Sequence, residues 1–166
     1  MKIICSIDSS TTKTGMALYV DGVLKEHLLI DYKNERDVDK RISKMCYSIY
    51  SQLKKWNPNI VVVEDDYNKN NVKTVKMLSN IIGAIKGYCV INDWECICIM
   101  PSQWRKEFSE FKSKMKRDEL KYISIQLVKK NTGIDCSEDE CDAINIGEAY
   151  LRILKRYCDD KQKNGL

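Results

Sequence analysis

KIICSIDSSTTKTGMALYVDGVLKEHLLI, residues 2–30, predicts a three-stranded meander at the start of the chain. Its first strand is an apolar run that ends on Asp8. Two more strands are expected at residues 15–20 and 23–30. Asp21-Gly22 lies between them, and this dipeptide favours the tight turn of a β-hairpin. The sheet therefore begins with antiparallel neighbours.

The rest of the chain alternates helix and strand patterns. Apolar residues at spacings of three and four predict an amphipathic helix over residues 38–56, and the β-branched run Ile60-Val61-Val62-Val63 predicts a buried strand. This order predicts an α/β fold with a mixed five-stranded sheet and helices on both faces. The later expected elements are a helix at residues 72–91, a strand at 95–99 and helices at 118–130 and 137–157.

Composition points to one globular domain. The chain has 166 residues, 43% hydrophobic and 31% charged, which suffices for one core. We expect a single domain over residues 1–158 and a polar C-terminal tail over residues 159–166. The start is acidic too early for a signal peptide, and no apolar run approaches the roughly 18 residues of a membrane span. A cytoplasmic location without membrane contact is therefore expected.

The eight cysteines do not form a metal-binding or disulfide pattern in the sequence. No C-x-x-C is present, and the nearest pairs are Cys96-x-Cys98 and Cys136-x4-Cys141. His27, the one histidine, is far from them along the chain. The spacing does not supply the four ligands of a structural zinc site. We therefore expect reduced thiols that pack as small apolar groups, and His27 receives no role.

Several acidic residues lie at strand ends and at the start of a predicted helix, which are positions where a ligand could bind. Asp8 and Glu64 each end a predicted strand, and ligands bind at the carboxyl ends of strands in sheets of this type. An acid at a strand end also commonly marks only where the chain leaves the core. Ser137 and Glu140 fit a capping box, and first-turn acids complement the helix dipole. Asp142 adjoins the apolar part of that helix, where a carboxylate must be paired or must bind a metal.

Four carboxylates are the candidate catalytic and metal-ligating residues. Their oxygens suit Mg²⁺, for which Mn²⁺ can substitute. Two such ions about 3.5–4 Å apart can activate water on one side of a phosphodiester and stabilise the leaving oxygen on the other. The four residues are Asp8, Glu64, Asp139 and Asp142.

These segments resemble the motifs of the RuvC-type Holliday junction resolvases. IDSSTTKTG at residues 7–15 is similar to the first motif, Val61-Val62-Val63-Glu64 to the second, and DECDAINI at residues 139–146 to the C-terminal D-x-x-D-A helix. The chain length is most similar to that of the bacteriophage members. The resemblance implies a ribonuclease H-like fold, a homodimer and metal-dependent hydrolysis of Holliday junctions and other branched DNA, with the four acids as metal ligands.

The chain departs from the family pattern at two places. Ser9-Ser10 stands where the family has Pro-Gly, which affects the turn after Asp8. Asp65 and Asp66 follow Glu64, so the ligand at this strand end could be shifted. Glu64 is the preferred candidate because it ends the apolar run.

The expected DNA-binding surface combines basic residues with one aromatic residue. Lysine clusters after Glu64 and before the helix at residues 118–130 could hold phosphates, although such clusters are often only solvated faces. The resemblance places at Tyr67 an aromatic residue that stacks on bases, and an ordinary loop tyrosine is equally compatible. The DNA-binding candidates are Lys13, Tyr67, Lys69, Lys73, Lys112, Lys114, Lys116 and Arg117.

Other assignments are compatible with the same residues. The four acids would equally serve a ribonuclease H or a flap-type nuclease, and a non-catalytic DNA-binding module could keep the fold. For the homodimer, the resemblance points to the helix at residues 72–91, on which Ile81 and Tyr88 lie off the main apolar stripe. A helix buried in its own domain is the alternative.

Overall fold

The computed structural model describes residues 1–65 and 72–163. Within these residues one mixed sheet has the strand order β3-β2-β1-β4-β5. The meander strands pair antiparallel, whereas β1 pairs with β4, and β4 with β5, in parallel. The predicted mixed five-stranded sheet is therefore confirmed. The strands are β1 Ile3–Ser9, β2 Lys13–Val20, β3 Val23–Asp31, β4 Ile60–Glu64 and β5 Glu95–Ile99.

The turn between β2 and β3 has the conformation that its sequence predicts. Asp21 and Gly22 have φ values of 48° and 82°. A type I′ turn needs positive φ at both central residues, and Asp-Gly adopts this conformation at low cost. The backbone N–H of Lys2 also donates to Asp21 Oδ1 at 2.7 Å, which ties the turn to the start of β1.

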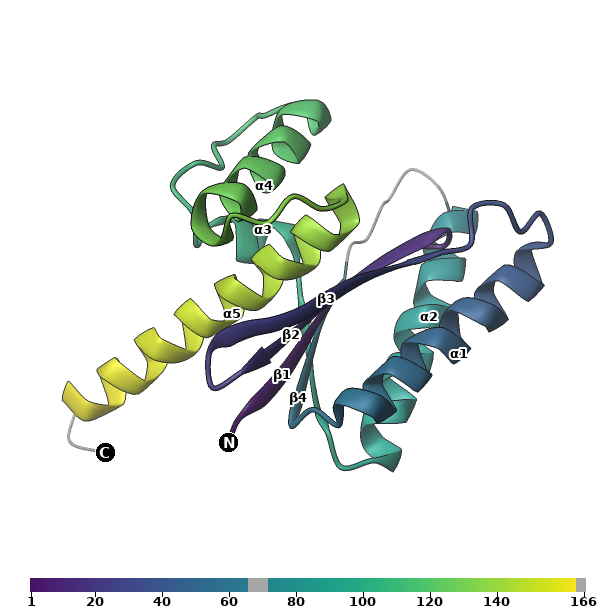
Figure 1. Cartoon of the computed structure of the whole chain (residues 1–166), viewed down its shortest axis with the longest axis horizontal. Coiled ribbons are helices and arrows are strands. Elements are labelled where there is room, and N and C mark those ends of the chain that lie inside the picture. Colours follow the sequence, from purple (N-terminus) through teal and green to yellow (C-terminus); the bar gives the residue numbers. More distant parts are fainter. Residues whose placement is uncertain (66–71, 164–166) are drawn as a thin grey trace.

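Helices cover both faces of the sheet (Figure 1). One face packs against α1 Val38–Trp56 and α2 Val72–Ile91, and the other against α5 Glu138–Lys163, with α4 Arg117–Thr132 packed on α5. Alternate residues of β1 serve the two cores, because successive side chains of a strand point to opposite faces. Ile4 packs on the α5 side, whereas Cys5 and Ile7 pack on the α1–α2 side.

Two glycines let α5 approach the sheet closely. A Cβ on Gly15 would lie 1.8 Å from the main-chain oxygen of Asp139, and one on Gly147 would lie 2.3 Å from a ring carbon of Tyr19. Hydrogen bonds hold the helix in this position: Ser6 Oγ donates to the Ala143 carbonyl, and Tyr19 Oη to that of Ile144, both at 2.7 Å. The N-terminal half of α5 is therefore fixed against β1 and β2.

Three sequence expectations need correction. A short helix, α3 Pro101–Arg105, follows β5 where only the end of a strand was expected, because Pro101 suits a first helical position. The expected polar tail is helical up to Lys163, as a continuation of α5. Ile81 is fully buried in the core of its own domain, and Tyr88 stacks against Tyr50 with ring centroids 4.6 Å apart. Ile81 is therefore not available to a dimer partner, whereas Tyr88 is half-buried.

Among the described residues, none of the helices combines the length and the apolar character needed to cross a membrane.

Candidate active site

The paired register of β1 and β4 brings two acids together. Ile7 and Val63 are register partners in this parallel pair, so Asp8 and Glu64 follow at neighbouring positions. Both residues lie one position beyond side chains that pack on the α1–α2 side. Strand alternation therefore turns Asp8 and Glu64 toward the face on which α5 lies.

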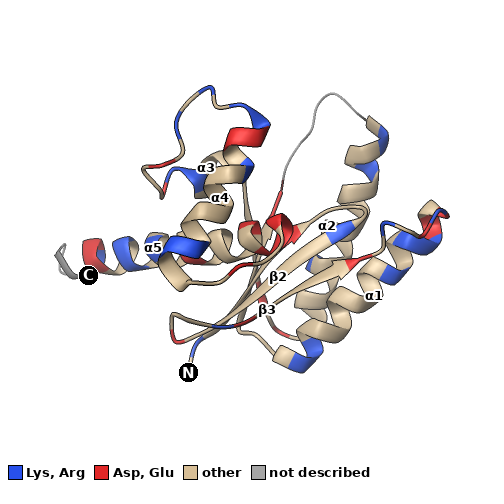
Figure 2. Cartoon of the chain, turned by 45° about the horizontal axis from the view of Figure 1, so that its top comes forward, with Lys and Arg blue, Asp and Glu red and all other residues tan. Residues whose placement is uncertain are grey.

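The first turns of α5 add the other two acids. Figure 1 shows that β1 and β4 run toward the end of the molecule at which α5 begins, and Figure 2 shows acidic segments gathered there. Gly15, the register partner of Asp8, is the residue that contacts the Asp139 backbone. All four sequence-predicted acids therefore approach one place from three separate elements.

The electrostatics of Asp8 reflects these acidic neighbours. Burial raises the pKa of Asp8 well above its usual range, and Glu64, Asp142, Asp139 and Glu138 raise it further, in that order. Carboxylates repel one another strongly only when they are close and partly shielded from water. Metal-free carboxylates thus compete for protons at this site, which is the condition that a bound cation relieves.

Asp142 has partners that stabilise its charge. Burial raises its pKa to about 6, while the Ser124 hydrogen bond and the charge of Arg105 act in the opposite direction. Ser124 Oγ donates to Asp142 Oδ1, and it accepts a 2.8 Å hydrogen bond from Asn145 Nδ2. Asn145 therefore orients the Ser124 hydroxyl toward the carboxylate.

Glu64 is positioned by a tryptophan, Trp104, that no motif in the sequence singles out. Trp104 Nε1 donates to Glu64 Oε2 at 2.5 Å, and the indole is fully buried. Helix α3, which the sequence pattern did not predict, carries this residue. Trp104 lies in the short helix that Pro101 begins. No helix or strand periodicity relates it to Glu64 in the sequence, so only the packing of α3 reveals the contact. Asn145 did leave a signal, since it is a polar residue within an apolar helix face.

Asp139 lies at the rim of the site among basic residues. Burial and Glu138 raise its pKa, whereas Lys13 and Lys121 act against that rise. Lys121 Nζ lies 2.7 Å from Glu138 Oε2, so its ammonium group reaches the start of α5. Lys121, on α4, therefore places a positive charge beside the acids at the start of α5.

The donor set fits hard divalent cations. It consists of carboxylate oxygens, and Mg²⁺ and Mn²⁺ prefer such ligands. Among the described residues, one group of three possible ligands has all its ligand atoms within 4.8 Å of one another, and it consists of His27, Cys136 and Glu140. The four acids do not form such a group, so their oxygens lie farther apart than the ligands of a bound ion.

The predicted DNA-binding residues are only partly assembled. Lys13 lies near Asp139, and its Nζ is 3.9 Å from Asp31. Lys112 and Lys114 line a hollow of about 420 Å³ with Arg105 and Lys106. Two expected residues, Tyr67 and Lys69, lie outside the described residues. The remaining candidates are exposed at the surface, and they are Lys73, Lys116 and Arg117.

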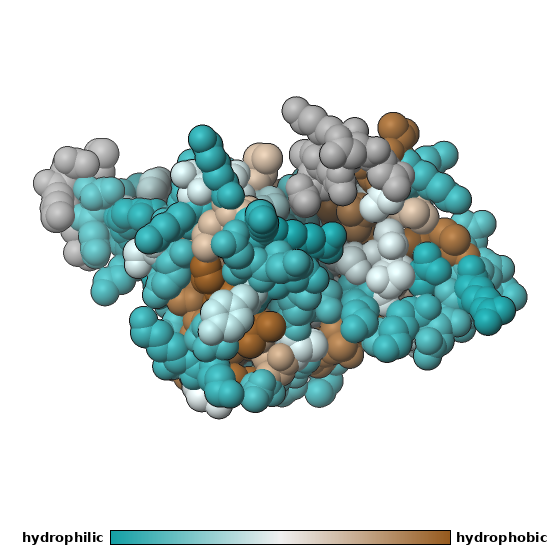
Figure 3. Space-filling view, turned by 90° about the horizontal axis from the view of Figure 1, so that it is seen from above, coloured by the Kyte–Doolittle hydropathy of each residue, from teal (hydrophilic) through white to brown (hydrophobic). Residues whose placement is uncertain are grey.

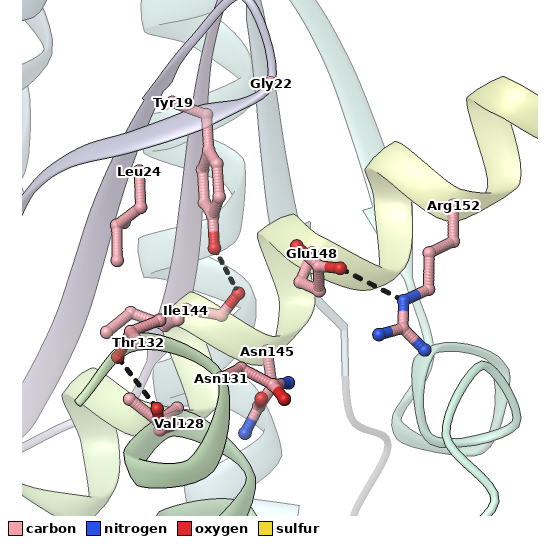
Figure 4. Close-up of a pocket in the computed structure, with 10 residues that line it drawn as sticks. All are labelled: Tyr19, Gly22, Leu24, Val128, Asn131, Thr132, Ile144, Asn145, Glu148 and Arg152. Carbon is pink, nitrogen blue, oxygen red and sulfur yellow. Dashed lines mark hydrogen bonds and ion pairs between the residues drawn. The ribbon is translucent and has the colours of Figure 1, made fainter. Parts of the chain in front are cut away.

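The surface at this end of the molecule is mainly hydrophilic, with small apolar areas between the elements (Figure 3). A separate hollow of about 380 Å³ lies between the β2–β3 hairpin, α4 and α5 (Figure 4). Its polar wall includes Glu148 and Arg152, whose side chains are 3.1 Å apart. None of the four acids lines it, so it is not part of the candidate active site.

The mixed sheet of order β3-β2-β1-β4-β5 with helices on both faces has the ribonuclease H-like fold. Within that class, the chain is similar to RuvC from Thermus thermophilus in complex with a Holliday junction substrate: TM-score 0.73 and 14% identity, over 92% of this chain and 96% of that chain. A second structure of that RuvC gives a TM-score of 0.70 at 15% identity, over 91% and 96% of the two chains.

The yeast mitochondrial Holliday junction resolvase is also similar, with a TM-score of 0.58 and 15% identity over 96% of this chain and 83% of that chain. No protein-family model matches the chain, and no curated protein matches it by sequence. The expected ribonuclease H-like fold, in its RuvC form, is thus confirmed by structure where sequence identity is too low to show it.

Proposed function

We propose that this chain is a metal-dependent, structure-selective endonuclease that cleaves Holliday junctions and other branched DNA. The convergence of Asp8, Glu64, Asp139 and Asp142 at one end of a RuvC-like sheet carries the proposal. A binding module would have no reason to keep carboxylates that destabilise one another without a cation. The RuvC structure with a junction substrate supports branched DNA as the substrate class.

The four acids would hold two Mg²⁺ ions, with Mn²⁺ as a substitute. Bound ions would supply an activated water and stabilise the leaving oxygen of the phosphodiester. Trp104 would keep Glu64 oriented, and Ser124 would keep Asp142 ionised by donating to it. Lys121 would add positive charge next to the reacting phosphate, where negative charge develops.

Basic residues around the site would hold the DNA backbone. Lys112 and Lys114 line a hollow beside Arg105, and Arg105 also acts on Asp142, so a phosphate there would lie near the acids. Tyr67 and the other predicted positions stay proposals for base stacking and phosphate contact. The DNA-contacting set that we propose is Lys13, Tyr67, Lys69, Lys73, Lys112, Lys114, Lys116 and Arg117.

A homodimer would present two such sites to one junction. Helix α2 carries three exposed apolar side chains, Val72, Val90 and Ile91, which are candidates for its interface. They lie at the ends of α2 and replace the buried Ile81 as interface candidates, and Tyr88 stays a candidate. We further propose that the enzyme works in the cytoplasm, since its eight cysteines are free thiols.

The test is cleavage of a labelled immobile four-way junction, compared with flaps, RNA–DNA hybrids and linear duplex, in Mg²⁺, Mn²⁺ or EDTA. Paired nicks in the junction that EDTA abolishes are expected. Asp8→Asn should abolish cleavage and keep junction binding, because it removes a metal ligand but none of the basic surface. Asp93→Asn, at an exposed turn, is the matched control.

Each of the other possible outcomes would assign a different function to the chain. Strict preference for the hybrid would make it a ribonuclease H, and preference for flaps would make it a flap-type nuclease. Binding of the junction with no cleavage in either metal would indicate a non-catalytic DNA-binding module.

A further inference from the structure

A second cluster of metal-ligating side chains lies on the sheet face that packs against α5. His27 comes from β3, Glu140 from the first turn of α5, and Cys136 from the segment just before that helix. His27 Nδ1 is 2.7 Å from Glu140 Oε1, and these atoms and Cys136 Sγ all lie within 4.8 Å of one another. Cys136 and Glu140 are close in sequence, whereas His27 is more than a hundred residues away, so the tertiary fold brings His27 to the other two.

A fourth donor lies next to this group. Cys141 Sγ is 3.4 Å from Cys136 Sγ, and the Cys141 side chain is buried. His27 and Glu140 keep 26% and 14% of their side-chain surface exposed, so a cation can reach the cluster from solvent. Both sulfurs are free thiols. The cluster thus combines nitrogen, sulfur and oxygen donors in a partly shielded position.

We propose that His27, Cys136 and Glu140 bind a zinc-like divalent cation, with Cys141 as the nearby fourth ligand. Zn²⁺ takes imidazole, thiolate and carboxylate ligands in tetrahedral sites. With Cys136 and Cys141 bound as thiolates, Glu140 as carboxylate and His27 neutral, the three negative charges would exceed the two of the ion, so the complete site would carry a net charge of −1. Ligands at the usual zinc distances lie roughly 3.3–3.8 Å from one another. The three side chains already lie within 4.8 Å of one another, and His27 Nδ1 and Glu140 Oε1, now 2.7 Å apart, would have to separate to admit the ion between them.

The chemistry separates this site from the four-carboxylate site. Mg²⁺ avoids sulfur and takes oxygen ligands, whereas a borderline-soft cation favours the cluster with a thiol and an imidazole. The two sites share α5, since Glu140 directly follows Asp139 in sequence. The inference does not depend on nuclease activity, because it rests on a different donor set.

The bound cation would fasten the first turn of α5 to the sheet. Ser137 caps this turn, with its Oγ 2.7 Å from Glu140 Oε2, so Glu140 is already held by two groups. A metal that joins β3 to this turn would restrain Asp139 and Asp142, which project from it. The role is structural, and its direct consequence is higher thermal stability in the presence of zinc.

The experiment titrates reduced full-length protein with Co²⁺, a spectroscopic substitute for Zn²⁺, in excess Mg²⁺. One equivalent of Co²⁺ should produce a thiolate-to-metal charge-transfer band, and Zn²⁺ should remove it. Cys136→Ser and His27→Gln should each weaken Co²⁺ binding at least about tenfold, as losses of even outer-sphere partners do. Cys158→Ser, at an exposed cysteine, and Asp8→Asn should leave the band unchanged.

A second measurement needs no variant. Zn²⁺ should slow the alkylation of Cys136 in the wild-type chain, followed by mass spectrometry of its peptide, and should raise the melting temperature. The absence of the charge-transfer band, or a band that survives the double substitution Cys136→Ser/Cys141→Ser, would overturn the proposal. Alkylation of Cys136 at the same rate with and without Zn²⁺ would overturn it as well.

Discussion

Gly15 faces the main-chain oxygen of Asp139 at a distance that only a glycine allows, since a Cβ there would lie 1.8 Å from that oxygen. The contact joins β2 to the first turn of α5, and Gly15 is also the register partner of Asp8. A helix that carries two of the acids is thereby placed beside the strand that carries a third. A side chain at this position would therefore require the first turn of α5 to move away from β2.

Gly15→Ala should push the start of α5 away from the sheet. We expect the free energy of unfolding to fall by about 1–3 kcal/mol, as for other overpacking substitutions. The rate of cleavage should fall by more than this loss of stability explains. Urea unfolding and junction cleavage measure the two effects. Gly83→Ala is the control: nothing lies within 4 Å of its new Cβ, and the helix should gain up to about 1 kcal/mol. Full cleavage by Gly15→Ala would contradict the account.

Trp104→Phe should weaken metal binding while it keeps most of the apolar packing. It removes the Nε1–H that Glu64 accepts, and lost outer-sphere partners typically cost about 10- to 100-fold in metal affinity or activity. Mn²⁺ titration followed by calorimetry measures this directly. Trp94→Phe is matched, because Trp94 is also buried but donates to Asn57, outside the site. Equal effects of the two substitutions would rule out the positioning role of Trp104.

Ser124→Ala should make Asp142 harder to ionise. The hydroxyl lowers the pKa of Asp142, which burial raises to about 6. Removing it should shift the pH at which Mn²⁺ binds toward higher values and cost about 1 kcal/mol of stability. Binding measured from pH 5 to pH 8 tests the shift. Ser48→Ala, which breaks a hydrogen bond to Tyr32 away from the acids, should shift nothing.

Stability without metal should depend on pH in a defined direction. The pKa values of Asp8, Asp139 and Asp142 are raised in the folded state, so folding favours their protonated forms. In EDTA, the contribution of these groups to stability should therefore fall as pH rises from about 4, the usual carboxyl pKa, toward 7. Thermal unfolding measures it, and Mg²⁺ or Mn²⁺ should restore the melting temperature.

Asp8→Asn should change that pH profile in a way that separates repulsion from folding defects. Without metal at pH 7 the variant should be more stable than the wild type, because one repelling charge is gone. Mg²⁺ should then stabilise it less than it stabilises the wild type. Asp93→Asn should follow the wild type in both conditions. A less stable Asp8→Asn variant in EDTA would show that the acids do not repel as described.

The sequence alone predicted the sheet, both helical layers and the four acids. Interactions between residues close in sequence were sufficient for these predictions. Alternating apolar residues and β-branched runs mark strands, and Asp21-Gly22 specifies its turn. Ser137 and Glu140 cap a helix as the pattern predicts. Asp8 and Glu64 could be paired because each ends a buried strand, and parallel neighbours bring such ends together. These features depend on residues close in sequence or on strand parity.

The tertiary structure decided what depends on contacts between distant elements. Trp104 is a partner of Glu64 only because the packing of α3 brings its indole to the end of β4. Ile81 is a core residue rather than a dimer contact because α2 packs on the sheet. His27 had no partner in the sequence, yet β3 and α5 bring its ring to Glu140 and Cys136. Spacing along a chain reports helix faces and strand parity, whereas a ligand set built from three elements exists only once those elements have packed.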